Sequence, residues 1–164
     1  MQPTPRTLER AARLARGPQP DAIVLLRADH KHVSELFARF EKLKSDGVQK
    51  KKLVDTICKE LTVHTRIEEE IFYPAVRAVL KEQDLLDEAE VEHAGAKDLI
   101  AQLQSMNPGD DLYDAKVIVL SEYIKHHVKE EHTEMFPKVR KTDLDMKELG
   151  ARMALRKQEL LGQH

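Results

Sequence analysis

The sequence predicts an all-α protein: an antiparallel up-down four-helix bundle with a short extra helix at each terminus. Apolar residues recur at helical spacing through four long segments, which is typical of helices that bury one face. No segment alternates apolar and polar residues in the manner of a strand, so we expect no sheet. Short connections separate the four segments, and short connections favour antiparallel neighbours.

The four long helices form the central domain, residues 21–140. Asp21 can cap the first helix. Pro74 is expected to stop or kink the second, and Pro137 to stop the fourth, because proline lacks a backbone N–H. The expected helices span residues 21–45, 50–72, 84–106 and 111–135.

The terminal segments predict two further helices. Residues 1–20 form an N-terminal extension with a short helix that begins near Pro5. Residues 141–164 contain an amphipathic helix, expected over 143–161 with Thr142 as its cap. This C-terminal helix would either pack on the bundle or mediate a homodimer, and the sequence leaves both alternatives open.

The two halves of the central domain repeat one another with a shift of 63 residues. Apolar positions follow the shift, and Pro74 falls on Pro137. A repeat unit of this length is a pair of helices, which differs from the 34-residue tetratricopeptide unit. The shift also superimposes three residues of metal-binding type in each half, namely His30 on His93, His64 on His127 and Glu68 on Glu131.

Histidine and glutamate four residues apart lie on one face of a helix, about 6 Å apart along its axis. His64 and Glu68 have this spacing, and so do His127 and Glu131. Each of the two histidines continues the apolar face of its helix, so both should point into the core. His30 and His93 would add one imidazole from each of the other two helices. Buried imidazoles and carboxylates are costly without a cation or full pairing, which favours a metal site over a structural polar network.

A single histidine with an acid four residues later is weak evidence, because 29 of the 164 residues are acidic. His126 and Glu130 form one such pair outside the repeat, since only His127 preserves the spacing. We therefore expect His126 at the edge of the bundle or in solvent. His132 and Glu69 also lie off the pattern, and we interpret them as surface residues.

The motifs resemble the hemerythrin-like (HHE cation-binding) family. The matching strings are "LLRADHKHVSELF", "ELTVHTRIEEEIFYPAV", "EVEHAGAKDLI" and "YIKHHVKEEHTEMFP". The resemblance implies a four-helix bundle that holds two iron ions joined by an oxo or hydroxo group. By this resemblance His30 and His64 bind one iron, His93 and His127 bind the other, and Glu68 and Glu131 bridge both.

The sequence departs from the pattern of oxygen-carrying hemerythrins. Those proteins have a second histidine one turn after the histidine of the third helix, where this chain has Lys97. Their last carboxylate is an aspartate five residues after its histidine, where this chain has Glu131 after four. One histidine fewer argues against reversible oxygen carriage and leaves a metal position for water, peroxide or another side chain. Further candidates for that position or for a supporting hydrogen bond are Glu60, Glu90 and Tyr123.

Composition excludes several classes of partner. A net charge of −2 and a pI of about 6.5 provide no basic field for nucleic acid. No apolar run approaches the roughly 20 residues that span a bilayer, and the N-terminus lacks the apolar core of a secretory signal. The single cysteine, Cys58, cannot form an internal disulfide, which predicts a cytoplasmic protein.

The expected function is to bind a small oxidant, or to react with one: dioxygen, peroxide or nitric oxide. The alternatives are an enzyme that disproportionates peroxide, an enzyme that donates iron for the repair of iron–sulfur clusters, and an iron store. Six nitrogen and oxygen ligands with shared carboxylates suit iron, or alternatively manganese. Zinc is the less favoured alternative, because it prefers closed four-coordinate sites.

Overall fold

The computed structural model describes residues 20–43 and 46–162. The helix expected near Pro5 lies outside the described residues. Within them, the chain forms helices and no strand. The helices and π-helical turns are α2 (Ala22–Lys42), α3 (Gly47–Ile67), η1 (Glu68–Phe72), α4 (Tyr73–Arg77), α5 (Gln83–Gln104), α6 (Tyr113–Glu130), η2 (Glu131–Met135), α7 (Phe136–Arg140) and α8 (Met146–Leu161).

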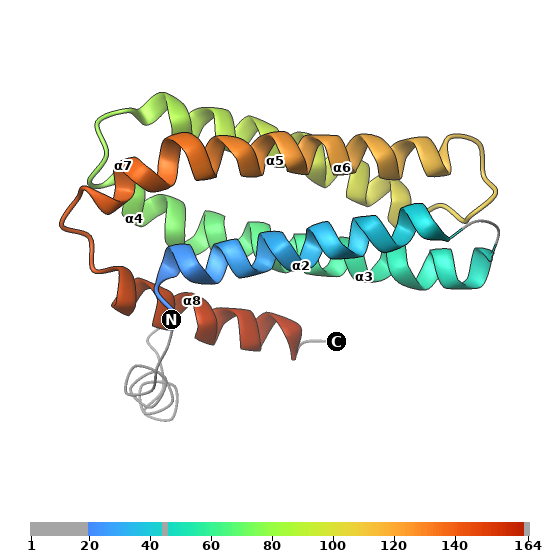
Figure 1. Ribbon diagram of the computed structural model, residues 1–164, viewed down its shortest axis with the longest axis horizontal. Helices are drawn as coiled ribbons and strands as arrows, with labels where there is room; N and C mark the ends of the chain where they lie inside the picture. The colour runs from blue at the N-terminus through green and yellow to red at the C-terminus, as the bar shows by residue number, and fades with distance from the viewer. Residues whose placement is uncertain (1–19, 44–45, 163–164) are drawn as a thin grey trace.

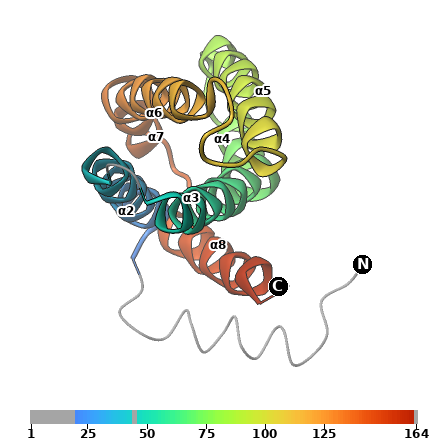
Figure 2. The ribbon, with the colours of Figure 1, turned by 90° about the vertical axis from the view of Figure 1, so that its right-hand side faces the viewer.

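The predicted fold class is confirmed. The four long helices α2, α3, α5 and α6 run side by side (Figure 1) and surround a common centre when viewed from the end (Figure 2). The C-terminal helix α8 lies outside this ring against α2 and α3, so it packs on the bundle within one chain. None of the described helices is long and apolar enough to cross a membrane.

Three helices begin at an aspartate whose side chain accepts a hydrogen bond from the first turn. The Asp21 carboxylate accepts from the backbone N–H of Val24 at 2.9 Å, which confirms the predicted cap of α2. The helix α8 starts later than predicted, because Asp145 rather than Thr142 is its cap. The hydroxyl of Thr142 instead donates to the backbone carbonyl of Val139 at 2.6 Å.

The prediction that Pro137 stops the fourth helix is wrong, and the second helix also continues past Pro74. The chain stays helical to Arg140 in one half and to Arg77 in the other. In both halves a π turn precedes the proline, and the wider turn accommodates a residue that can neither donate to, nor pack closely against, the preceding turn. Both π turns begin at the glutamate of the repeated motif, Glu68 or Glu131.

Two apolar clusters fill the bundle on either side of a polar layer. One cluster lies toward the end formed by α4 and α7, and α8 contributes Leu149 and Met153 to it. The other lies toward the α2–α3 and α5–α6 connections, with Phe37 and Leu120 among its members. The repeated histidines and glutamates occupy the helix turns between these clusters, so rigid apolar packing holds the polar layer from both sides.

Candidate metal centre

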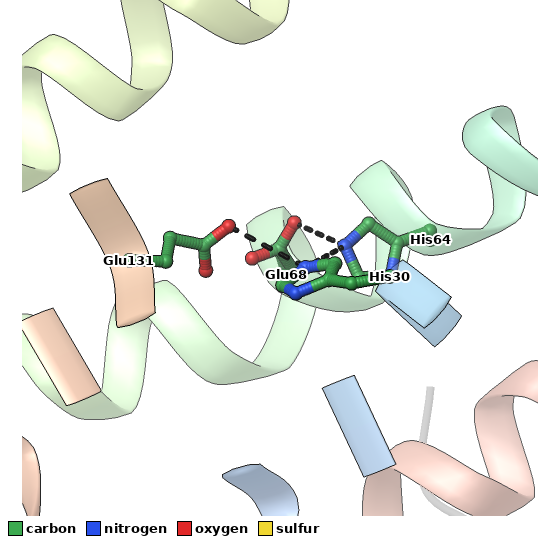
Figure 3. A group of neighbouring side chains, drawn as sticks. All are labelled: His30, His64, Glu68 and Glu131. Atoms are coloured by element: carbon green, nitrogen blue, oxygen red, sulfur yellow. Dashed lines mark hydrogen bonds and ion pairs between the residues drawn. The ribbon is translucent and has the colours of Figure 1, made fainter. Parts of the chain in front are cut away.

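The six residues of the repeated motif converge in the middle of the bundle. Donor atoms of His30, His64, Glu68 and Glu131 form one group, within 4.8 Å of one another (Figure 3). A second group consists of Glu68, His93 and His127. All six side chains are buried, and the two carboxylates most completely, with 0% exposure for Glu68 and 1% for Glu131.

Each carboxylate lies between a histidine of its own half and a histidine of the other half. Oε1 of Glu68 is 2.8 Å from Nε2 of His64 and 3.4 Å from Nε2 of His93. Oε1 of Glu131 is 2.7 Å from Nε2 of His127 and 3.7 Å from Nε2 of His30. The two glutamates therefore connect two pairs of imidazoles.

The imidazoles within each pair point the same nitrogen at one another. Nε2 of His30 is 3.1 Å from Nε2 of His64, and Nε2 of His93 is 3.2 Å from Nε2 of His127. Neighbouring ligands at right angles around an ion, each about 2.1 Å from it, lie about 3 Å apart. The separations within each pair fit two donors of one ion.

Among the described residues, the two carboxylates form no hydrogen bond, although histidine nitrogens lie close to both. Neither oxygen of Glu68 or of Glu131 accepts a hydrogen bond from any residue in the described part of the chain. A buried carboxylate without hydrogen bonds is strongly disfavoured, and a coordinated cation removes that cost. The donor set of imidazoles and shared carboxylates thus fits a pair of metal ions.

Without a cation, the layer distributes protons unevenly. Burial, followed by the charge of Glu68, raises the pKa of Glu131 to about 8. Burial and the charge of His64 lower the pKa of His30 to about 3. Burial also opposes a charge on His64, but Glu68 and Asp29 outweigh it and raise the pKa of His64 to about 10. A cation would relieve this crowding of like charges around two buried carboxylates.

The outer nitrogen, Nδ1, of each imidazole faces a partner at the edge of the site. Nδ1–H of His64 donates to Oδ2 of Asp29 at 3.1 Å. Nδ1 of His127 lies 3.4 Å from Oε2 of Glu92, the residue that the 63-residue shift pairs with Asp29. Partners of this kind fix the orientation of an imidazole and adjust its strength as a ligand.

The other two outer partners correct the sequence interpretation of Glu69 and His132 as surface residues. Nδ1 of His30 is 2.9 Å from Nε2 of His132, and one of these nitrogens donates to the other. Nδ1 of His93 lies 3.7 Å from Oε1 of Glu69. Both residues are partly buried, and the repeat pairs them with each other. The two halves therefore place different chemistry behind equivalent histidines.

Tyr73 is a site residue that sequence reasoning missed. Its buried hydroxyl lies 3.3 Å from Nε2 of His93 and 3.1 Å from Nε2 of His127. Burial, and then the charges of Glu131 and Glu68, raise the pKa of this phenol well above its usual value. The equivalent residue of the other half is Phe136, which stacks on His30 with 6.2 Å between ring centroids.

The π turn explains why helical periodicity does not reveal Tyr73. Nine residues of α-helix rotate a side chain by about 900°, which would place Tyr73 opposite His64. A π turn takes up one extra residue, so the two side chains end up only about 80° apart. The only available signal was a tyrosine beside a proline just after the motif, which is not specific.

The three additional candidates lie differently. Glu60 and Glu90 belong to neither group of converging donor atoms, and Glu90 is exposed and pairs with Arg77 at 3.6 Å. Tyr123 is 50% exposed but lines a small cavity beside the four histidines. Lys97, at the place of the missing histidine, points to Glu69 and pairs with it at 2.6 Å.

The cavity beside the histidines has a volume of about 20 Å³, which is room for one molecule the size of water. Its apolar lining includes one residue from each long helix, about one turn from the histidine of that helix. These residues are Val33, Leu61, Ala96 and Ile124. The arrangement leaves a small apolar space next to the converging imidazoles.

Comparison with known proteins also points to cation binding. The pattern of the Hemerythrin HHE cation binding domain matches residues 21–139. The chain is 31% identical over 113 residues to an uncharacterised protein of Mycobacterium tuberculosis, covering 67% of this chain and 68% of that one. It is 29% identical over 116 residues to a DNA nickase of Nostoc sp., covering 71% of this chain but only 32% of the nickase.

A similar fold is found in the crystal structure of a Hemerythrin HHE cation binding domain-containing protein from Mycobacterium kansasii. The TM-score is 0.75 and the sequence identity 26%, with 87% of this chain and 88% of that chain covered. The similarity therefore extends over most of both chains.

Proposed function

The chain belongs to the hemerythrin HHE cation-binding domain family, and we propose that it holds two iron ions in the polar layer and uses them to bind or transform a small oxidant. The observation that supports this most is the pair of buried carboxylates, Glu68 and Glu131, which lack hydrogen bonds and each lie between imidazoles of both halves. His30 and His64 would hold one ion, and His93 and His127 the other. When bound, the ions supply redox chemistry toward dioxygen, peroxide or nitric oxide.

The protein residues are proposed to orient the small molecule, exclude water and move protons. The apolar residues around the 20 Å³ cavity limit access to a molecule of very few atoms. The phenol of Tyr73 lies beside His93 and His127, where it can donate a proton from its oxygen or complete the ligand set of that position. A proton donor within the site favours reaction with peroxide over passive carriage of oxygen.

The proposed organisation assigns residues 21–140 to the metal-binding bundle and 141–164 to a C-terminal segment that supports it. The net charge of −2 favours a small-molecule ligand over nucleic acid, so we do not extend the nickase activity of the Nostoc relative to this chain. The single cysteine is consistent with work in a reducing compartment such as the cytoplasm.

Iron content tests the metal assignment. Protein loaded with Fe(II) without oxygen and then oxidised should contain two irons per chain and absorb in the near ultraviolet. Manganese in their place would correct the identity of the metal, and one tightly bound zinc in an iron-free protein would refute the proposal.

Parallel exposure of the iron-loaded protein to peroxide, dioxygen and nitric oxide separates the functions. Oxygen release from peroxide well above that of free iron supports a peroxide-disproportionating enzyme. Reversible spectral change with dioxygen or nitric oxide, without turnover, supports binding or sensing. Iron uptake far beyond two per chain would indicate storage instead.

A further inference from the structure

The helix α8 reaches the metal centre through a lysine. Nζ of Lys157 lies 2.5 Å from Oδ1 of Asp29, and the second oxygen of the same carboxylate accepts the hydrogen bond from Nδ1 of His64 at 3.1 Å. The contact joins residues 128 positions apart in the chain. The contact is partly buried, since the Asp29 side chain is 11% exposed and that of Lys157 29%.

The other half of the bundle provides an internal comparison. Glu92 occupies the place of Asp29 in the repeat, but in the described part of the chain its ion pair is with His127, and no lysine or arginine joins it. Its neighbours are His126 and the acidic Glu130. The carboxylate that a lysine holds forms a hydrogen bond to its imidazole, whereas the one without a lysine stays 3.4 Å away and forms none.

We propose that Lys157 is a positioning residue for the metal position of His30 and His64. Lys157 fixes the carboxylate of Asp29, and Asp29 holds His64 with its proton on Nδ1, so that Nε2 presents its lone pair to the ion. This inference rests on the proposed metal function and adds a role for α8, which lies outside the bundle. A helix that only covered apolar surface would not require a charged contact to a residue behind a metal ligand.

A second ion pair of α8 supplies a matched control. Nε of Arg156 lies 2.7 Å from Oε2 of Glu70, so the neighbouring residue ties the same helix to the bundle without touching Asp29. A variant of Arg156 tests whether any loosening of α8 is enough to weaken metal binding. Replacing either residue with methionine keeps a long, unbranched side chain and removes the charge.

The experiment compares K157M, K157R and R156M as full-length proteins. Stepwise Fe(II) affinity is measured by calorimetry without oxygen. Loss of an outer partner of a metal ligand typically weakens metal binding by about 10–100-fold. We expect K157M to weaken one of the two steps by about tenfold and to leave the other unchanged. K157R should retain most of the affinity, and R156M should behave as the unmodified protein.

The same variants are examined without metal by nitrogen-15 NMR of the histidine rings. The unmodified protein should show a His64 Nδ1–H resonance protected from exchange with water, which K157M loses and R156M keeps. Equal effects of K157M and R156M, or weakening of both steps by K157M, would refute the inference, because they indicate general loosening of α8. An unmodified protein that binds no Fe(II) would refute the proposed function, and the resonance would still decide the role of Lys157.

Discussion

The two halves of the bundle carry the same ligands in different surroundings. Each half contributes two histidines and one glutamate with identical spacing. At the first metal position, that of His30 and His64, His30 faces His132 and stacks on Phe136. At the second position, that of His93 and His127, the equivalent His93 faces Glu69 and contacts the hydroxyl of Tyr73.

The repeat preserves a set of residues that could hold metal in each half, while the residues behind the histidines make the two positions unequal. At the first position Phe136, an aromatic ring with no polar group, stacks on His30. The second has a phenol that can exchange a proton. We therefore expect the second position to carry the reaction with the oxidant and the first to serve mainly as its partner.

The largest effect should come from the feature that both halves share. Replacing Glu68 or Glu131 with alanine removes a carboxylate that lies between the two histidine pairs, so each variant should bind at most one iron per chain. The expected loss is the same for both variants, because each glutamate contacts both halves. Iron analysis after gel filtration measures it. Two irons per chain in either variant would contradict the bridging role.

Exchange of the aromatic residues tests the inequality directly. Y73F gives the second position the phenyl ring of the first, and we expect both irons to remain while peroxide turnover falls about 100-fold, the lower range for loss of an acid–base group. F136Y adds a hydroxyl at the first position and should leave turnover close to that of the original protein. Oxygen release per iron is the measurement. Equal effects of the two variants would remove the distinction between the positions.

Protons should compete with metal in a predictable direction. In the absence of metal the pKa of Glu131 is raised to about 8 and that of His64 to about 10, so both groups hold a proton at neutral pH that an ion must displace. Fe(II) affinity should therefore increase with pH, by up to about tenfold per unit for each proton released. The contribution of Glu131 should disappear above about pH 8, where it is already ionised.

Calorimetry in buffers of different ionisation enthalpy counts the released protons. E131Q is the matched variant, because its amide has no proton to release. For the first iron bound, it should release one proton fewer than the original protein. An affinity that does not change between about pH 6 and 8 would contradict the charge distribution of the unloaded site.

The smallest effect should follow exchange of the outer partners. H132E gives His30 the carboxylate that His93 has, and a carboxylate strengthens an imidazole as a ligand. We expect the first position to bind Fe(II) more tightly by about tenfold or less, and E69H to weaken the second by a similar factor. Stepwise titration of both variants decides this. A shift in the opposite direction would show that these partners do not adjust the ligands.

The sequence predicted that the six motif residues converge, because the repeat and the α-helical spacing both hold as far as Glu68 and Glu131. The 63-residue shift also pairs Asp29 with Glu92, so their role as outer partners could have been found from the sequence. Beyond the two glutamates the prediction fails, because a π turn changes the phase of the helix. Tyr73 consequently faces the site, although α-helical periodicity places it elsewhere.

Other features depend on tertiary packing that no local pattern reveals. The contact from Lys157 to Asp29 requires knowledge of how α8 docks, and the sequence left open whether that helix packs on the bundle or on a second copy. The helix ends past Pro74 and Pro137 were missed for a related reason. Proline disfavours an α-helix, but a wider turn directly before it allows the chain to continue.

The proposed function requires two ions that share one layer of the bundle, each beside its own pair of histidines. Diffraction from crystals of the iron-loaded protein, recorded at the iron absorption edge, locates the ions without any assumption about ligands. We expect two anomalous peaks, one next to His30 and His64 and the other next to His93 and His127, with Glu68 and Glu131 between them. A single peak, or iron bound only at the protein surface, would refute the two-ion site.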